Sequence, residues 1–232
     1  MHPANLCAKV REFRADMGIA HDGDADRLLL CDENGALVDG DDILAICGLQ
    51  MLSEGTLAGK TVVATVMSNA GLDAAIREAG GSVIRTPVGD KHVIDTLLTE
   101  KLNLGGEQSG HLIFRDYSTT GDGLVAALQI LSIMKQQDKP LSELSKCWKR
   151  YPQLVTNVKV REKRPFDQLN DVLDLVKKAE GEVVPLGGRV LLRYSGTEPK
   201  ARLLIEGPDA AVMERWSKVI CDSLTRQVGA TT

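Results

Sequence analysis

Three aspartates at alternate positions are the strongest candidates for chemistry in this chain. Gly23 and Ala25 separate Asp22, Asp24 and Asp26, and these small spacers let the backbone curl so that the carboxylates converge. Three negative charges a few ångströms apart repel strongly unless a cation lies between them. Carboxylate oxygens are hard ligands, which favours Mg²⁺ or Ca²⁺ over zinc. The spacing therefore indicates a loop for a divalent cation.

An EF-hand calcium loop and a solvated acidic turn are the alternatives for this segment. The EF-hand loop also begins with alternating acids, and Glu33 falls at its twelfth position. That loop needs Gly at its sixth position, where this chain has Arg27, and a helix after the Glu, where it has the turn signal Asn34-Gly35. Leu28-Leu29-Leu30 instead indicates a buried strand. The solvated acidic turn stays open, because such turns are common without a metal.

A glycine-rich segment downstream carries groups that suit a sugar. Glu107 and Ser109 lie two residues apart between Gly106 and Gly110. On an extended backbone this spacing places both side chains on one face, ready to bind two neighbouring hydroxyls. A glycine-rich hairpin with a buried carboxylate would account for the same residues.

A second segment carries groups that suit a phosphate. It reads Arg193-Tyr194-Ser195-Gly196-Thr197-Glu198-Pro199, with Arg202 beyond it. Backbone N–H groups and hydroxyls around a glycine can cradle a phosphate, and arginine pairs with it bidentately. A tight turn between two strands is the alternative. The binding candidates are Arg193, Ser195, Gly196, Thr197 and Arg202.

Together and in this order, the three segments resemble the α-D-phosphohexomutase family. Gln108 beside Glu107, the stretch from Thr119 to Gly123 and the stretch from Val88 to Lys91 look like the bacterial phosphoglucosamine mutase branch. Members of the phosphomannomutase and phosphoglucomutase branch more often have Met in place of Gln108. The resemblance covers about Ala15 to Ile220. A phosphomannomutase or phosphoglucomutase fragment, or a non-catalytic module that binds sugar phosphates, stays open as an alternative.

The resemblance implies a role for each candidate residue. The three aspartates would hold Mg²⁺, and Arg27 would neutralise charge beside them. Lys91 and His111 would carry charge or protons, although a structural histidine accounts for His111 equally well. Glu107 and Ser109 would bind the hydroxyls of a hexosamine phosphate, and the arginine-rich loop would hold the phosphate that is not reacting. A phosphoserine would donate to the substrate, and the other phosphate of the bisphosphate intermediate would return to the serine.

The phosphoserine of that mechanism is the main departure from the family. Family members carry it in an additional N-terminal domain, in a motif like Ser-His-Asn-Pro, and this sequence contains no Ser-His pair. The nearest lookalike, Ser68-Asn69-Ala70-Gly71, fits a helix N-cap better. The chain is therefore expected to be the C-terminal half of a mutase, inactive without the missing N-terminal domains. A homodimer stays open for its assembly.

Composition favours a cytoplasmic enzyme without nucleic-acid or membrane partners. The net charge of −4 provides no basic surface for nucleic acid or anionic lipid. The longest apolar segment, from about Leu124 to Met134, is too short to span a bilayer. The five cysteines lack CxxC spacing, which favours reduced thiols, and no signal peptide is apparent at the N-terminus.

Helix and strand patterns alternate along the chain and predict an α/β fold. Residues 1–36 are expected to be the remnant of a preceding α/β domain with the metal loop. Residues 37–150 should form a mostly parallel α/β domain that binds the sugar, with Asp41 capping a helix to Leu52. Residues 151–232 should form a small α+β domain, after a hinge at Tyr151-Pro152, with a helix from Phe166 to Ala179. Its phosphate loop should join the two central strands, Arg189 to Tyr194 and Ala201 to Ile205, at an exposed sheet edge.

Overall fold

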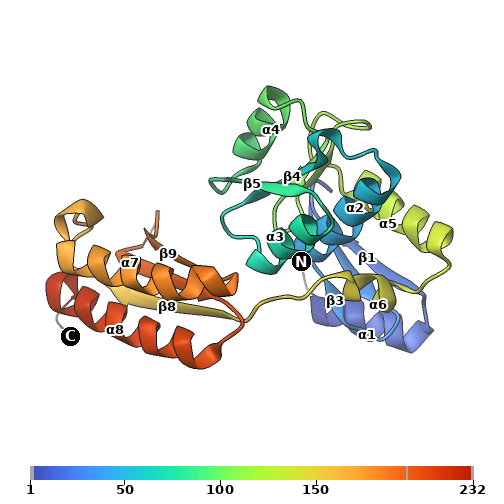
Figure 1. Cartoon of the computed structure of the whole chain (residues 1–232). Helices are drawn as coiled ribbons and strands as arrows, with labels where there is room; N and C mark the ends of the chain where they lie inside the picture. The colour runs from blue at the N-terminus through green and yellow to red at the C-terminus, as the bar shows by residue number, and fades with distance from the viewer. Residues whose placement is uncertain (1–2, 197, 231–232) are drawn as a thin grey trace. The chain divides into compact units, whose positions relative to one another are not determined.

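The computed structural model describes residues 3–196 and 198–230, and these form two compact units (Figure 1). The first unit extends to Lys149 and the second begins at Arg150. Within the described residues, no helix combines the length and the apolar character needed to cross a membrane.

The first unit begins with a small antiparallel sheet that carries the predicted metal loop, residues 22–27 (called the metal loop below). Its strands β1 (Met17–His21), β2 (Leu28–Asp32) and β3 (Leu37–Val38) pair in that order. The helix α1 (Pro3–Phe13) packs on one face through Cys7 and Val10 against Cys31, whereas Leu28 and Leu30 face the main core of the unit. Because β3 pairs with β2, the sheet extends past the domain boundary expected after residue 36.

A second, four-stranded sheet forms the centre of the first unit. Its order is β5 (Ser82–Thr86), β4 (Thr61–Thr65), β6 (Leu104–Gly106) and β7 (Leu112–Phe114). β4 runs parallel to both β5 and β6, while β7 is antiparallel to β6 because only a short turn joins them. The mostly parallel α/β sheet predicted from the sequence is confirmed.

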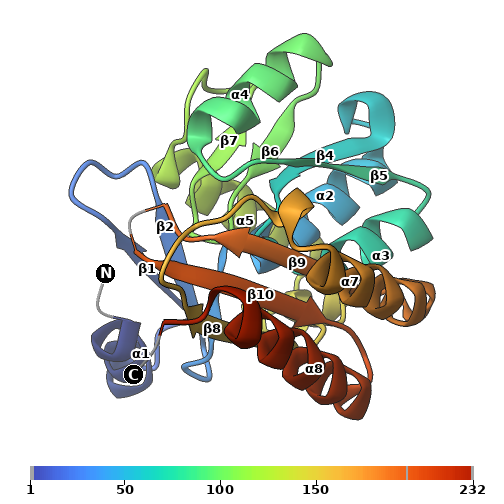
Figure 2. The same ribbon diagram turned by 90° about the vertical axis from the view of Figure 1, so that its left-hand side faces the viewer.

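Helices cover both faces of this sheet (Figure 2). Alternation along β4 directs Val62 and Ala64 to one side and Val63 to the other, as expected for a strand buried on both faces. The core containing Val62 and Ala64 is completed by α2 (Gly40–Glu54), α3 (Ala70–Glu78), α5 (Gly123–Gln137) and α6 (Leu141–Leu144). On the opposite side α4 (Asp90–Thr99) packs against Val63.

The start of α2 differs from the sequence expectation. Asp39, rather than Asp41, is the N-cap: its carboxylate accepts hydrogen bonds from the N–H groups of Asp41 (3.0 Å) and Asp42 (3.3 Å). Asp42 accepts from the N–H of Asp39 at 2.9 Å, which completes a capping box. The helix begins at Gly40 and continues past Leu52 to Glu54, where Gly55 ends it in the left-handed conformation.

The second unit is a three-stranded antiparallel sheet with two helices, as predicted for a small α+β domain. Its strands are β8 (Gln153–Lys159), β9 (Arg189–Tyr194) and β10 (Lys200–Glu206), in the order β8-β10-β9. The long helices α7 (Asn170–Val183) and α8 (Ala210–Val228) lie side by side and share one apolar core with the strands (Figures 1 and 2).

Two expectations for this unit are wrong. β10 is central and β9 is an edge strand, so the turn after Tyr194 joins one central strand to one edge strand. The helix expected from Phe166 begins later, because Phe166–Gln168 forms a short 3₁₀ turn before α7 starts at Asn170.

Candidate functional site

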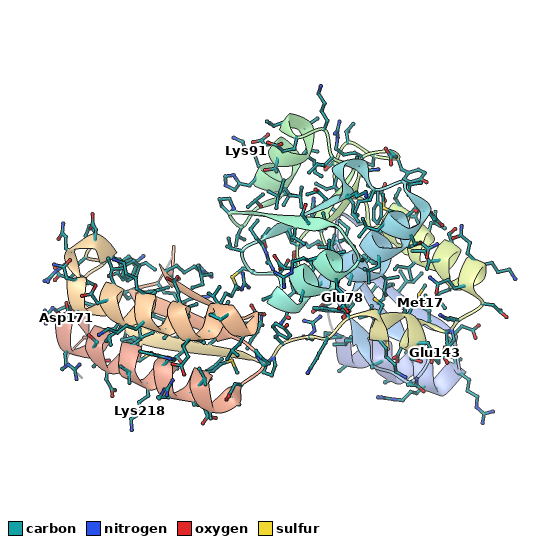
Figure 3. All side chains as sticks on the ribbon, viewed as in Figure 1. Met17, Glu78, Lys91, Glu143, Asp171 and Lys218 are labelled. Carbon is teal, nitrogen blue, oxygen red and sulfur yellow. The ribbon has the colours of Figure 1, made fainter. Side chains whose placement is uncertain are left out.

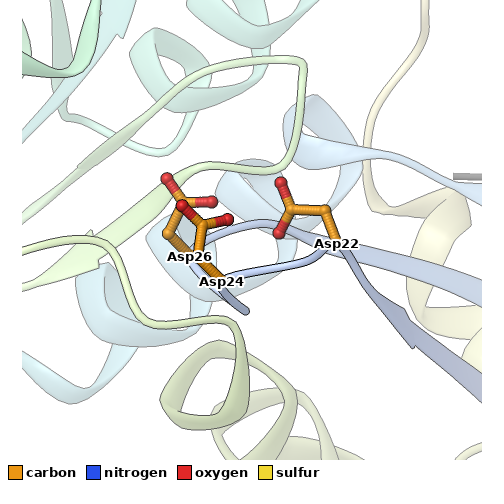
Figure 4. Close-up of side chains that lie close together, drawn as sticks. All are labelled: Asp22, Asp24 and Asp26. Carbon is orange, nitrogen blue, oxygen red and sulfur yellow. The ribbon is translucent and has the colours of Figure 1, made fainter.

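The three aspartates lie in the loop between β1 and β2 and their carboxylates converge (Figure 4). One carboxylate oxygen from each of Asp22, Asp24 and Asp26 lies within 4.8 Å of the other two. The loop turns sharply at Ala25, which has a φ of +59° and whose N–H donates to the Asp22 carbonyl at 3.3 Å. The structure brings these predicted ligands together because they share one short turn.

An arginine and a histidine lie against this cluster. The Arg27 Nε atom is 2.7 Å from Asp22 Oδ2 and 3.6 Å from Asp26 Oδ1, and His111 Nδ1 is 3.0 Å from Asp26 Oδ2. Burial alone would raise the pKa of Asp26, but the hydrogen bond and charge of His111, together with Arg27, outweigh it and hold that pKa below its usual value. Asp26 is thus stabilised as the anion that a metal ligand must be.

Unsatisfied oxygens indicate that this cluster fits a hard cation. Asp26 Oδ1 and Asp22 Oδ2 are buried and accept no hydrogen bond, although Arg27 lies near both as an ion pair. Buried carboxylate oxygens without hydrogen bonds are costly unless another positive group satisfies them. The three carboxylates offer the oxygen donors that Mg²⁺ prefers.

The calcium-loop alternative does not fit the structure. Glu33, which would be the twelfth-position ligand, instead accepts hydrogen bonds from the hydroxyl and the N–H of Ser142. Asn34 and Gly35 form a turn into the strand β3, so no helix follows the loop.

His111 ties the metal loop to the glycine-rich segment. It is buried, with 5% of its surface exposed, and forms an isolated antiparallel bridge with Arg27. Its ring lies so close to Gly121 that a Cβ there would be 2.3 Å from both Cε1 and Nε2. The Gly123 N–H also donates to the Ala25 carbonyl at 3.0 Å, so the start of α5 holds the loop from a second side.

His21 is a further support of the loop, although sequence reasoning left it as structural or exposed. Its Nδ1 lies 3.2 Å from the Arg27 carbonyl oxygen, and it packs against Gly123. Its place next to Asp22 in the sequence was the only signal for this role.

The glycine-rich segment is a tight turn, not the extended backbone expected. The Gly110 N–H donates to the Glu107 carbonyl at 3.0 Å, and Gly110 has a φ of +93°. Glu107 and Ser109 therefore do not share a face through strand alternation. Ser109 is exposed, whereas Glu107 is half-buried and its Oε1 accepts the Gly89 N–H at 2.9 Å.

That hydrogen bond connects the turn to the segment containing Lys91. Lys91 lies exposed in the first turn of α4, two residues after Gly89 (Figure 3). Sequence reasoning placed Gly89 within a stretch that resembles the family but gave it no role of its own. As a glycine it can adopt a φ of +128°, and its N–H donates to the Glu107 carboxylate.

The phosphate-loop candidates lie in the second unit. Arg193 and Arg202 are directly paired across β9 and β10, so their side chains leave the same face of the sheet. Ser195 is buried, and Gly196 is exposed with open space where a Cβ would be. Thr197, the fifth predicted residue, lies outside the described residues.

Arg202 carries an unsatisfied donor in this loop. Its Nη2 donates to Glu198 Oε2 at 2.8 Å and to Ser195 Oγ at 3.5 Å, while its Nε is buried without a hydrogen-bond partner. Glu198 also accepts from Lys200 at 2.6 Å, and these hydrogen bonds, from Lys200 first and then Arg202, lower its pKa. Sequence reasoning assigned Glu198 no role, although its i,i+4 spacing to Arg202 was visible.

Comparison with known proteins gives consistent matches along the chain. Residues 39–151 match the family described as phosphoglucomutase/phosphomannomutase, alpha/beta/alpha domain III, and residues 155–223 match its C-terminal domain. A phosphoglucosamine mutase from Nitratidesulfovibrio vulgaris (strain Miyazaki F) is 50% identical over 98% of this chain and 50% of its own length. One from Geotalea daltonii is 48% identical over 100% of this chain and 51% of its own length.

Solved structures show the same fold at lower sequence identity. A phosphoglucomutase/phosphomannomutase family protein from Burkholderia thailandensis is 23% identical, with a TM-score of 0.75, over 99% of this chain and 52% of its own. The N-acetylphosphoglucosamine mutase of Aspergillus fumigatus, solved with GlcNAc-6P and magnesium, is 19% identical, with a TM-score of 0.70. This match covers 89% of this chain and 48% of the Aspergillus chain. The chain spans about half the length of the curated relatives it matches.

Proposed function

Because the chain belongs to the phosphoglucomutase/phosphomannomutase family, we propose that it is the metal-binding and substrate-recognition portion of a phosphoglucosamine mutase. Such an enzyme interconverts glucosamine 6-phosphate and glucosamine 1-phosphate through a phosphoserine and a bisphosphate intermediate. The observation that carries the proposal is the cluster of Asp22, Asp24 and Asp26, in which two buried carboxylate oxygens accept no hydrogen bond. The sequence around it is 48–50% identical to proteins of that name.

In this proposal three parts of the chain have separate tasks. Residues 1–36, the end of the second domain of the complete mutase, provide the metal loop. Residues 37–150 bind the sugar, and residues 151–232 bind the phosphate. The phosphoserine comes from residues outside this chain, since the sequence has no Ser-His pair.

The metal loop neutralises charge on the phosphoryl group that moves. The three aspartates would hold Mg²⁺, which supplies a positive charge to the transferred group when bound. Arg27 holds Asp22, and His111 holds Asp26, so both carboxylates stay oriented. Arg27 adds a fixed positive charge beside them.

The sugar and phosphate loops orient the substrate. Glu107 binds sugar hydroxyls together with Ser109, and one of its oxygens already accepts the Gly89 N–H. Lys91, two residues after Gly89, contributes a positive charge. Arg193, Ser195, Gly196, Thr197 and Arg202 hold the phosphate that is not reacting. Accurate positioning and charge stabilisation provide most of the catalysis in phosphoryl transfer.

A chimera tests this function directly. The N-terminal half of the Nitratidesulfovibrio phosphoglucosamine mutase, fused to this chain, should interconvert the two glucosamine phosphates in a coupled assay, whereas the chain alone should not. The same chimera with Asp24→Asn should lose most of that activity, and an Asp95→Asn chimera, changed at an exposed position of α4, should keep it.

Two results would count against the proposal. A folded chimera that converts glucose or mannose phosphates but not glucosamine phosphates would assign the chain to the other branch of the family. Turnover by the chain alone at about 1–1000 per second, the usual range for enzymes, would mean that the phosphoryl donor lies within it.

A further inference from the structure

A segment far from the phosphate loop in sequence lies along it in the second unit. This strap segment, residues 160–166, leads from β8 towards α7. The Val160 N–H donates to the Pro199 carbonyl at 3.0 Å, and the Tyr194 hydroxyl donates to the Arg164 carbonyl at 2.6 Å. The rings of Phe166 and Tyr194 stack, with centroids 4.3 Å apart and planes 6° from parallel. The strap segment therefore holds the loop at both ends.

Lys163 holds the middle of the loop. Its Nζ donates to the carbonyl oxygens of Ser195 (2.5 Å) and Gly196 (3.2 Å). Both carbonyl oxygens therefore accept from one ammonium group, which lies 32 residues before Ser195 in the sequence. Hydrogen bonds to a charged donor are the stronger kind, so this pair is well suited to fix the loop backbone.

The orientation of those carbonyls determines where the N–H of Gly196 points. In a planar trans peptide the C=O and N–H groups point in opposite directions. Because the Ser195 carbonyl faces Lys163, the N–H of Gly196 faces away from the strap segment. The ammonium also polarises that peptide, which makes its N–H a better donor. Gly196 is exposed, so this N–H is available to a ligand.

Resting on the proposed function, we propose that Lys163 is a positioning residue of the phosphate site. It keeps the Ser195–Gly196 peptide turned so that its N–H donates to a phosphate monoester on the side of the loop away from the strap segment. Arg202 cannot replace it, because its contacts are to the side chains of Ser195 and Glu198 and not to these carbonyls.

The test is a titration of the full 232-residue chain with inorganic phosphate, followed by ¹⁵N–¹H NMR at the Gly196 amide. Lys163→Met removes the ammonium and keeps similar length. It should weaken phosphate binding about tenfold, the scale of losing one charge-assisted hydrogen bond. It should also move the Gly196 amide signal of the ligand-free chain and reduce its shift on binding. Lys163→Arg should bind within about threefold of the parent.

A matched control separates positioning from a change in net charge. Lys218→Met removes an exposed lysine from α8 of the same unit (Figure 3) and should leave both the affinity and the Gly196 signal unchanged. At 1 M salt, where charges are screened beyond about 3 Å, a simple charge effect of Lys163 should vanish. The altered Gly196 signal in Lys163→Met should persist there, because it reports the direction of a peptide.

The outcomes distinguish this inference from the function on which it rests. If the parent binds phosphate and Lys163→Met shows the same affinity and the same Gly196 signal, only the role of Lys163 is overturned. If the parent does not bind phosphate at this loop, the proposed phosphate site is overturned as well. Should Lys163→Met fail to fold, Lys163→Ala, which also removes the ammonium donor, gives the same comparison.

Discussion

Replacing Gly121 with Ala should push His111 away from the metal loop. A Cβ at this position would lie 2.3 Å from Cε1 and Nε2 of the His111 ring and 2.7 Å from Cδ2. Carbon atoms in ordinary contact stay about 3.5–4.0 Å apart, so the ring must move by about 1 Å. Gly121 does not have a positive φ, so the clash is the only effect of the new methyl group on the folded chain.

The cost follows from two contributions. Overpacking a buried site typically costs about 1–3 kcal/mol. Moving the ring also stretches the 3.0 Å hydrogen bond from His111 to Asp26, which is worth about 1 kcal/mol at this partly exposed carboxylate. Gly121→Ala should therefore lower the free energy of unfolding by about 2–4 kcal/mol in urea titrations. It should also weaken Mg²⁺ binding measured by calorimetry.

Two further variants isolate the cause. Gly181→Ala makes the same change within α7, where a Cβ meets no atom within 4 Å. It should stabilise the chain by about 0.5–1 kcal/mol. In a His111→Ala background the ring is absent, so Gly121→Ala should cost less than about 0.5 kcal/mol. An equal cost with and without the ring would refute the steric reasoning.

Three other predictions concern the metal loop, the phosphate loop and the hydrogen bonds between Ser142 and Glu33. Asp24→Asn should weaken Mg²⁺ binding in calorimetry while Asp95→Asn does not, and equal affinities would mean that the loop is not the metal site. Arg202→Ala should cost about 1.5–3 kcal/mol of phosphate binding in NMR titrations, and shifts that persist elsewhere in that variant would point to another site. Burial tends to raise the pKa of Glu33, but hydrogen bonds from Ser142 outweigh it and lower that pKa. The stability from this carboxylate is therefore present above its unfolded pKa of about 4.3 and lost as the pH falls through the lower folded value. Unfolding experiments should show Glu33→Gln about 1 kcal/mol less stable than the parent at pH 7, and a difference that does not shrink below about pH 4 would contradict this.

The convergence of the three aspartates was predictable because all three lie in one short segment. Asp22, Asp24 and Asp26 occupy alternate positions of one hairpin, so the turn alone brings them together. The contact between His111 and Asp26 spans 85 residues and depends on how two sheets meet in the first unit. The sequence could place His111 only in an adjoining loop, because nothing local fixes such a distance.

Backbone direction and strand order were the features that the sequence could not determine. Glu107 and Ser109 fit an extended strand by spacing, but the hydrogen bond between Gly110 and Glu107 closes a turn there. The pattern from Arg189 to Ile205 indicated a hairpin without saying on which side a third strand pairs. β8 pairs with β10, and its buried side chains join those of α7 and α8 in one apolar core, a contact between distant segments that local patterns do not reveal. Asp39 could have been recognised, since an acid three residues before Asp42 is the pattern of a capping box.

The loop that we propose to bind phosphate already contains a negatively charged side chain next to Arg202. Arg193 and Arg202 are paired across two strands, and like charges in that arrangement repel each other. Glu198 lies beside Arg202 and stays ionised because Lys200 and Arg202 lower its pKa. The carboxylate therefore keeps the Arg202 guanidinium in place before a ligand arrives, which reduces the ordering cost of binding.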